Sequence, residues 1–148
     1  MSLEENKAIV RRFIEAYNQR DLDLFDDFVA ADFVDYTHQQ QGLESLKKIF
    51  NIAFIGMPDL HETIEDIIAE GDKVWVRVTY KGTNTGEWLG LAPTGNKITA
   101  MGAVDIYRIV NGKLAEYWNV TDPMDFNKQL GIIEYTEKGK KLFPEDAK

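Results

Sequence analysis

The chain has 148 residues, of which 44% are hydrophobic and 28% are charged, a balance typical of one globular domain with a substantial core. Its formal net charge of −8 argues against nucleic acid as a partner, because phosphate binding needs clustered lysine and arginine. The absence of cysteine excludes disulfides and thiolate chemistry, and two histidines are too few for a histidine metal site. We therefore expect no cysteine or histidine metal site, and the sequence has no glycine-rich phosphate loop that would indicate a nucleotide cofactor. No apolar run is long enough to cross a bilayer and no secretory leader is recognisable, so we expect no membrane partner and a cytoplasmic location.

The first part of the chain predicts helices. Apolar residues recur at helical spacing up to Tyr17, which closes the apolar stripe of the first helix. The predicted elements are a helix over 3–18, a short helix capped by Asp21, an extended piece over 32–38, and a helix from Gly42 to just before Pro58.

The second part changes to the alternation of β-strands. Tight turns are predicted at Gly71-Asp72 and Asn111-Gly112, and a longer glycine-rich connection spans 83–96. The predicted strands are 59–69, 73–83, 97–110 and 113–121, followed by a short helix from Pro123 and a C-terminal tail over 132–148.

Helices followed by consecutive antiparallel strands predict an α+β fold, with the helices packed on one face of a curved sheet. No linker or repeat divides the sequence, so we expect a single domain over 1–148. A sheet that curves around helices leaves an internal cavity, which is a common place for a small-ligand pocket.

The hairpin around Asn111-Gly112 carries a candidate catalytic group. Counting every second residue along its second strand places Glu116, Trp118, Val120 and Asp122 on one face. If that face points inward, Asp122 is a carboxylate beside a large aromatic residue in a partly apolar pocket, which is the setting of a general base.

Five motifs and their order resemble one known family, the SnoaL-like polyketide cyclases, whose fold is that of nuclear transport factor two. They are Gly86-Glu87-Trp88-Leu89-Gly90, Pro93-Thr94-Gly95, Asp105-Ile106-Tyr107-Arg108, Asn111-Gly112-Lys113-Leu114 and the segment 116–122. The resemblance implies a cone of three N-terminal helices packed on a strongly curved, mostly antiparallel sheet that encloses a pocket. It covers the chain from the first helix to Gly131.

The resemblance also implies a reaction and its residues. In these cyclases the aspartate that closes the Trp-x-x-x-Asp strand is the general acid/base, and that position is Asp122 here. The implied reaction is an intramolecular aldol ring closure without metal or organic cofactor. The polar residue that the family carries on a neighbouring strand has its nearest counterpart in Asp105. The enolate needs nearby hydrogen-bond donors, for which the candidates are Tyr17, Tyr36, His38 and Trp88.

Asp122 also has a purely structural interpretation. It precedes Pro123, which favours the first position of a helix, and Asp125 lies where the acid of a capping box would reach back. A carboxylate that accepts backbone N–H bonds has a lowered pKa and is a poorer base, so the two roles conflict.

Asp105 lies in a mostly apolar strand, where an unpaired carboxylate is costly. We expect it to pair with Arg77 on a neighbouring strand, either as a structural ion pair or as part of a catalytic site. If Asp105 and Asp122 share one cavity, each raises the pKa of the other.

The remaining candidates are aromatic residues and one histidine. Trp118 is the preferred pocket residue among the three tryptophans. Trp75 and Trp88 are also candidates for substrate binding, with the core or an interface as the alternative, and Trp88 in the glycine-rich connection suits a lid or a dimer contact. Tyr17 is expected in the pocket wall, and His38 either at the pocket mouth or on the surface.

The leading functional hypothesis is a cofactor-free acid/base enzyme that acts on a small hydrophobic substrate containing carbonyl groups. The alternatives are a non-catalytic protein that binds a small hydrophobic molecule, and an isomerase or hydrolase that uses the same pocket. We also expect a homodimer, because both faces of the strand 73–83 carry bulky side chains.

Overall fold

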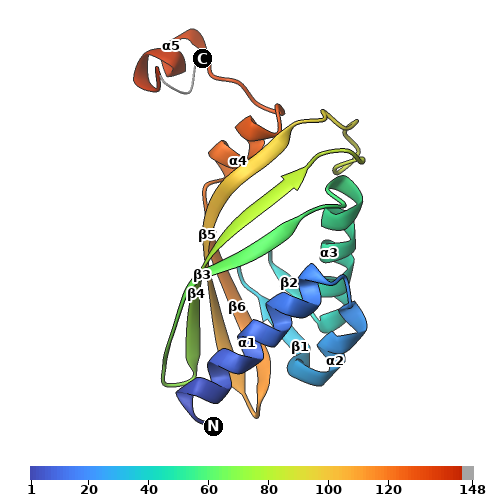
Figure 1. Ribbon diagram of the computed structural model, residues 1–148, viewed down its shortest axis with the longest axis vertical. Coiled ribbons are helices and arrows are strands. Elements are labelled where there is room, and N and C mark those ends of the chain that lie inside the picture. The colour runs from blue at the N-terminus through green and yellow to red at the C-terminus, as the bar shows by residue number, and fades with distance from the viewer. Residues whose placement is uncertain (145–148) are drawn as a thin grey trace.

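The structure, a computed structural model, describes residues 1–144 and confirms the predicted α+β fold (Figure 1). Its N-terminal helical elements are α1 (Leu3–Asn18), the 3-10 turn η1 (Leu22–Leu24), α2 (Phe25–Phe28) and α3 (Leu43–Gly56). The strands are β1 (Val29–Asp35), β2 (Gln40–Gln41), β3 (His61–Glu70), β4 (Lys73–Thr83), β5 (Lys97–Val110) and β6 (Lys113–Thr121). The remaining helices are α4 (Pro123–Gln129) and α5 (Glu137–Leu142). None of the described helices is long and apolar enough to cross a membrane.

The strands form one curled sheet in the order β2-β1-β6-β5-β4-β3, and the sheet does not close into a barrel (Figure 1). The consecutive strands β3 to β6 pair antiparallel. Tight turns join β3 to β4 and β5 to β6, and a longer connection joins β4 to β5, as the turn signals predict. Strand β1 pairs in parallel with β6, which places the N-terminal strand beside the first half of the last strand. The residues on β1 and β6 therefore meet although they are far apart in the sequence.

The first helix shows how the sequence fixes an element and its orientation. Ser2 caps α1, and a reciprocal pair of hydrogen bonds with Glu5 forms a capping box. The apolar stripe that includes Val10, Phe13 and Tyr17 is buried against the sheet. Tyr17 thus lies in the last turn of α1, with its side chain packed against the sheet.

The core lies between the N-terminal helices and one face of the sheet. In Figure 1, α1, α2 and α3 lie together on that side, while α4 packs near the start of β5 and α5 lies beyond it. Strand β4 contributes Val74, Val76 and Val78 to the core, all fully buried, whereas Trp75 between them is 47% exposed on the opposite face. The alternation of β4 therefore defines an inner and an outer face of the sheet.

A β-bulge changes which face of β6 points inward. Ile109 pairs with Leu114, but Arg108 pairs with Glu116, so Ala115 is an extra residue on β6. A one-residue shift moves every later side chain to the other face. Tyr117 and Asn119 consequently lie on the inner face, where Asn119 pairs with Asp105.

Two predicted boundaries in the N-terminal half are wrong. The extended segment is Val29–Asp35 instead of 32–38, because the Asp35 side chain accepts the backbone N–H groups of Thr37 and His38 and turns the chain. The second α-helix begins at Phe25 instead of directly after Asp21, whose side chain makes no capping hydrogen bond, and residues Leu22–Leu24 form a 3-10 turn.

Two other boundaries also differ. Strand β3 begins at His61, two residues later than predicted, while the preceding Asp59 side chain accepts hydrogen bonds from Thr83. The predicted C-terminal tail contains helix α5, which is capped by Thr136, and residues 145–148 of that tail lie outside the described part of the chain.

Candidate active site

A small cavity of about 40 Å³ lies between the helices and the inner face of the sheet. Roughly three water molecules would fill it. The helices contribute a largely apolar wall, and the sheet contributes the polar groups. The lining residues are Phe13, Tyr17, Phe33, Leu46, Phe50, Glu62, Tyr80, Asp105, Tyr107 and Tyr117.

Asp105 is the most completely buried acid of this cavity, with 1% of its surface exposed. The Tyr117 hydroxyl donates to Asp105 Oδ1 over 2.8 Å, and the side-chain amide of Asn119 donates to the same oxygen over 2.6 Å. The Tyr80 hydroxyl donates more weakly to Oδ2, over 3.4 Å. Asp105 is thus a buried carboxylate held by neutral donors from β4 and β6 instead of by a cation.

The predicted pairing of Asp105 with Arg77 is wrong. Val76, not Arg77, lies on the inner face opposite Asp105, because successive side chains of β4 alternate between the faces. Arg77 lies on the outer face and donates from Nε to Asp66 Oδ2 over 2.6 Å. Its guanidinium therefore does not neutralise the cavity.

Glu62 is a second buried acid that the sequence analysis missed. It lies at the start of β3, pairs with Tyr80 across the strands, and is 5% exposed. Its Oε1 atom is buried and has no hydrogen-bond partner among residues 1–144. The sequence could have predicted this position, because Glu62 is two residues from Ile64 in the same strand and therefore lies on the same face as that apolar residue.

The two acids have different charge preferences. Burial and then the negative charge of Asp105 raise the pKa of Glu62 well above its usual value. Burial also raises the pKa of Asp105, but the hydrogen bonds from Asn119, Tyr117 and its other neighbours lower it and oppose that effect. The arrangement favours one proton on the pair, held by Glu62, and an ionised Asp105.

The cavity's four tyrosines stay neutral hydrogen-bonding groups. Burial is the main cause that raises the pKa of Tyr17, Tyr80, Tyr107 and Tyr117, and the nearby carboxylates raise these values further. Tyr17 and Asp105 are the two predicted site residues that line this cavity.

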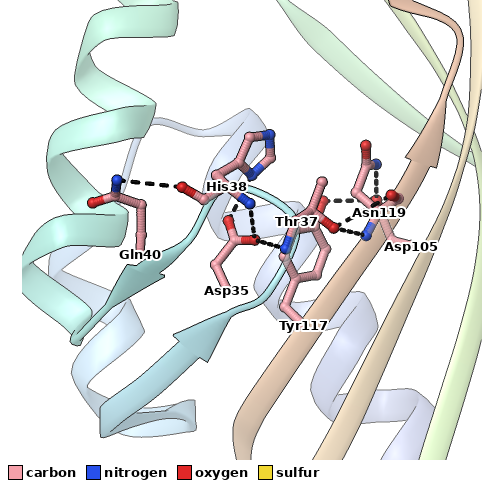
Figure 2. Close-up of polar contacts among 7 residues, drawn as sticks. All are labelled: Asp35, Thr37, His38, Gln40, Asp105, Tyr117 and Asn119. Atoms are coloured by element: carbon pink, nitrogen blue, oxygen red, sulfur yellow. Dashed lines mark hydrogen bonds and ion pairs between the residues drawn. The ribbon is translucent and has the colours of Figure 1, made fainter.

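The turn after β1 connects His38 to the buried site (Figure 2). His38 Nδ1 lies 2.7 Å from Oδ2 of Asp35, which is buried, whereas about half of the His38 side chain is exposed. That hydrogen bond is the main cause that raises the pKa of His38 above its usual value. His38 therefore lies at the surface end of this turn and does not line the cavity.

Thr37 links the same turn to β6. The Asn119 backbone N–H donates to Thr37 Oγ1 over 2.6 Å, and the Asn119 side chain donates to Asp105 (Figure 2). The Asp35 carboxylate accepts the N–H of Thr37 over 3.0 Å, so the turn itself is fixed. A continuous set of hydrogen bonds thus orients Asn119 toward Asp105.

Asp122 lies outside the residues that line the cavity. Its side chain is exposed and caps α4 by accepting the backbone N–H of Asp125 over 3.0 Å. Asp125 does not complete a capping box, since its carboxylate instead accepts a hydrogen bond from Gln129. The predicted inward position of Asp122 is wrong because the bulge at Ala115 reverses the phase of the strand.

The same reversal moves Trp118 to the outer face, where it stacks on Tyr36 with ring centroids 5.0 Å apart. The Tyr36 hydroxyl donates to Glu116, which also forms an ion pair with Arg108. Trp118 and Tyr36 therefore belong to an outer-face cluster and not to the cavity wall.

The other two tryptophans also lie away from the cavity. Trp75 is on the outer face of β4, as described above. Trp88 lies in the long connection between β4 and β5, packs edge-on against Phe126 of α4, and approaches Gly56 closely. No group of three or more potential metal ligands occurs within residues 1–144.

Comparison with known proteins relates the chain to polyketide cyclases. Residues 7–130 match the family described as SnoaL-like polyketide cyclase. The chain is 26% identical over 134 residues to aklanonic acid methyl ester cyclase AcmA of Streptomyces galilaeus, a match that covers 87% of this chain and 92% of AcmA. It is 24% identical over 139 residues to aklanonic acid methyl ester cyclase DnrD of Streptomyces peucetius, a match that covers 88% of this chain and 94% of DnrD.

Solved structures show the same fold. AclR of Streptomyces galilaeus, a proposed hydroxylase, superposes with a TM-score of 0.81 at 27% identity, covering 97% of this chain and 92% of AclR. TsrD of Streptomyces laurentii also gives a TM-score of 0.81, at 25% identity, covering 90% of this chain and 99% of TsrD.

Proposed function

The chain belongs to the SnoaL-like polyketide cyclase family, and from that premise we propose that it is a cofactor-free acid/base enzyme which closes a ring by intramolecular aldol addition. The substrate class is a small hydrophobic molecule with carbonyl groups, of the kind that the names of AcmA and DnrD indicate. The observation that carries the proposal is the buried Asp105 carboxylate in a largely apolar cavity.

Asp105 is the base in this proposal. A carbon flanked by two carbonyl groups is acidic enough to lose a proton to a carboxylate whose pKa is raised by burial. The neutral donors Tyr117 and Asn119 hold the carboxylate in one position without neutralising its charge. The resulting enolate carbon then attacks a second carbonyl carbon of the same molecule, and the tyrosine hydroxyls offer hydrogen bonds to the oxygens on which charge develops.

Substrate entry requires the apolar wall to move. A cavity of about 40 Å³ is far below the roughly 300 Å³ or more of a typical small-molecule site. Leu46 and Phe50 of α3 form part of the lining, and the hydrogen-bond donors to Asp105 come from β4 and β6, not from α3. We therefore place substrate entry on the side of α3.

The test compares Asp105→Asn with Asp122→Asn, using aklanonic acid methyl ester as the first substrate. We expect Asp105→Asn to lower kcat by roughly 10²- to 10⁴-fold with little change in melting temperature. Asp122→Asn keeps a residue that also caps helices well, and we expect it to retain activity. Loss of activity in Asp122→Asn with activity retained in Asp105→Asn would refute this assignment of the base.

The product distinguishes the alternatives. Aldol closure yields an isomer of the substrate, so its mass is unchanged, whereas hydroxylation of the kind proposed for AclR adds an oxygen atom. Tight binding without any product would favour the non-catalytic ligand-binding alternative.

We also propose that the protein forms a homodimer through the outer face of the sheet. The exposed side chains of Ile68, Trp75 and Val120 support this, because large apolar groups on a sheet face commonly mark an interface. A purely monomeric species in sedimentation experiments would refute it.

A further inference from the structure

Glu62 is a buried carboxyl group to which the mechanism above gives no role. It lines the cavity together with Asp105, and its Oε1 atom has no hydrogen-bond partner among residues 1–144. Leaving such an atom unpaired costs about 1–3 kcal/mol. A glutamine or an apolar residue would avoid the burial of an ionisable group here, so the acid calls for a chemical explanation.

The backbone of Glu62 is held in place from a different element. Asn18, the last residue of α1, accepts the N–H of Glu62 over 2.9 Å and donates to its carbonyl oxygen over 2.8 Å. The two bonds span 44 residues of sequence and fasten the start of β3 to the end of the helix. Glu62 is thus held by α1 through Asn18 and by β4 through its pairing with Tyr80, and these contacts fix the position from which its side chain enters the cavity.

The surroundings of Glu62 favour its neutral, proton-bearing form. Its carboxyl group is buried beside the negative charge of Asp105, and none of the described residues that line the cavity is a lysine, an arginine or a histidine. Two carboxyl groups that share such a site do not both ionise, because like charges repel strongly there. A neutral carboxylic acid can donate a hydrogen bond and deliver a proton.

We propose that Glu62 is the general acid that protonates the carbonyl oxygen when the ring closes, while Asp105 removes the carbon-bound proton. This inference rests on the proposed function. Asp105 takes a proton from carbon, the new carbon–carbon bond forms, and the attacked carbonyl oxygen takes the proton of Glu62 to become a hydroxyl group.

The proton balance closes within the pair. After one turnover Asp105 carries the proton and Glu62 is ionised, so one proton transfer from Asp105 to Glu62 restores the starting state. The Tyr80 hydroxyl contacts Asp105 and neighbours Glu62 across the β3–β4 pairing, which places it suitably to pass that proton. No external acid, base or oxidant is needed.

The first experiment measures the proton on Glu62 without substrate. Infrared spectra at neutral pH are recorded for the unmodified protein, Glu62→Gln and Glu65→Gln, the last being an exposed glutamate of the same strand. We expect the C=O stretch of a protonated carboxylic acid in the unmodified protein and in Glu65→Gln, and its loss in Glu62→Gln. A band that persists in Glu62→Gln but disappears in Asp105→Asn would overturn the proposal, as would the absence of a band in the unmodified protein.

The second experiment measures turnover of the same variants. Glutamine keeps the size of Glu62 and can still donate a hydrogen bond, but it has no acidic proton. We expect kcat of Glu62→Gln to fall by roughly 10²- to 10⁴-fold although its melting temperature is no lower than that of the unmodified protein, and kcat of Glu65→Gln to stay unchanged.

The outcomes separate this inference from the proposed function. Undiminished cyclisation by Glu62→Gln would overturn the role of Glu62 and leave the proposed function intact. An unmodified protein that cyclises none of the carbonyl substrates offered would overturn both, and the infrared band would then report only a charge state.

Discussion

Replacing Glu62 with glutamine should change how the stability of the fold depends on pH. The pKa of Glu62 is raised well above its ordinary value of 4.5 in the folded protein, mainly by burial. Below that ordinary value both the folded and the unfolded chain hold the proton, so Glu62 makes no pH-dependent contribution. As the pH rises above 4.5, the unfolded chain releases the proton and the folded chain keeps it. The unmodified protein therefore loses stability relative to Glu62→Gln as the pH rises, until the pH passes the folded-state pKa.

The size of this stability change follows from a single proton, the one on Glu62, which the folded chain keeps and the unfolded chain releases. The free energy of unfolding of Glu62→Gln minus that of the unmodified protein should increase by up to about 1.4 kcal/mol per pH unit. Urea unfolding at a series of values from about pH 5 to about pH 8 measures this difference. Asp105 is present in both proteins, and Glu65→Gln serves as a control whose difference from the unmodified protein stays flat. A flat or falling difference for Glu62→Gln would refute the reasoning, because it would mean that folding does not hold the proton on Glu62.

Three further changes test other parts of the structure. Asp122→Ala should lower the free energy of unfolding by about 1 kcal/mol in urea titrations, because it removes the cap of α4, and a loss of turnover at equal stability would contradict the capping role. The NMR titration of His38 should have its midpoint above 6.5, and Asp35→Asn should lower it, because the hydrogen bond to Asp35 is the main cause of the raised pKa; an unchanged midpoint counts against that cause. Gly86→Ala should destabilise the protein by at least about 2 kcal/mol, because the added Cβ would lie 1.8 Å from a backbone oxygen of α3, whereas Gly102→Ala meets open space and should be tolerated.

Much of the fold was predictable because its elements follow local rules. The apolar stripe of α1, Gly42 before α3 and the turn at Asn111-Gly112 each act within a few residues, and each marks an element that the structure contains. The end of β1 was less predictable, because it depends on which way the Asp35 side chain turns and on the parallel pairing with β6. Such long-range pairing leaves no mark in the local pattern.

The candidate site was harder to predict because a single residue of register decides its composition. From the tight turn at Asn111-Gly112, uninterrupted pairing would place Trp118 opposite Asp105 and bring Asp122 to the inner face. The extra residue at Ala115 instead places Asn119 opposite Asp105, so the acid receives an amide donor and the tryptophan goes to the outer face. Glu62 depends on a still longer connection, since the residue that fixes its backbone belongs to α1. Periodicity identifies which residues share a face of one strand, but only the register between strands tells which of those faces meet, and the chemistry proposed for this protein depends on that register.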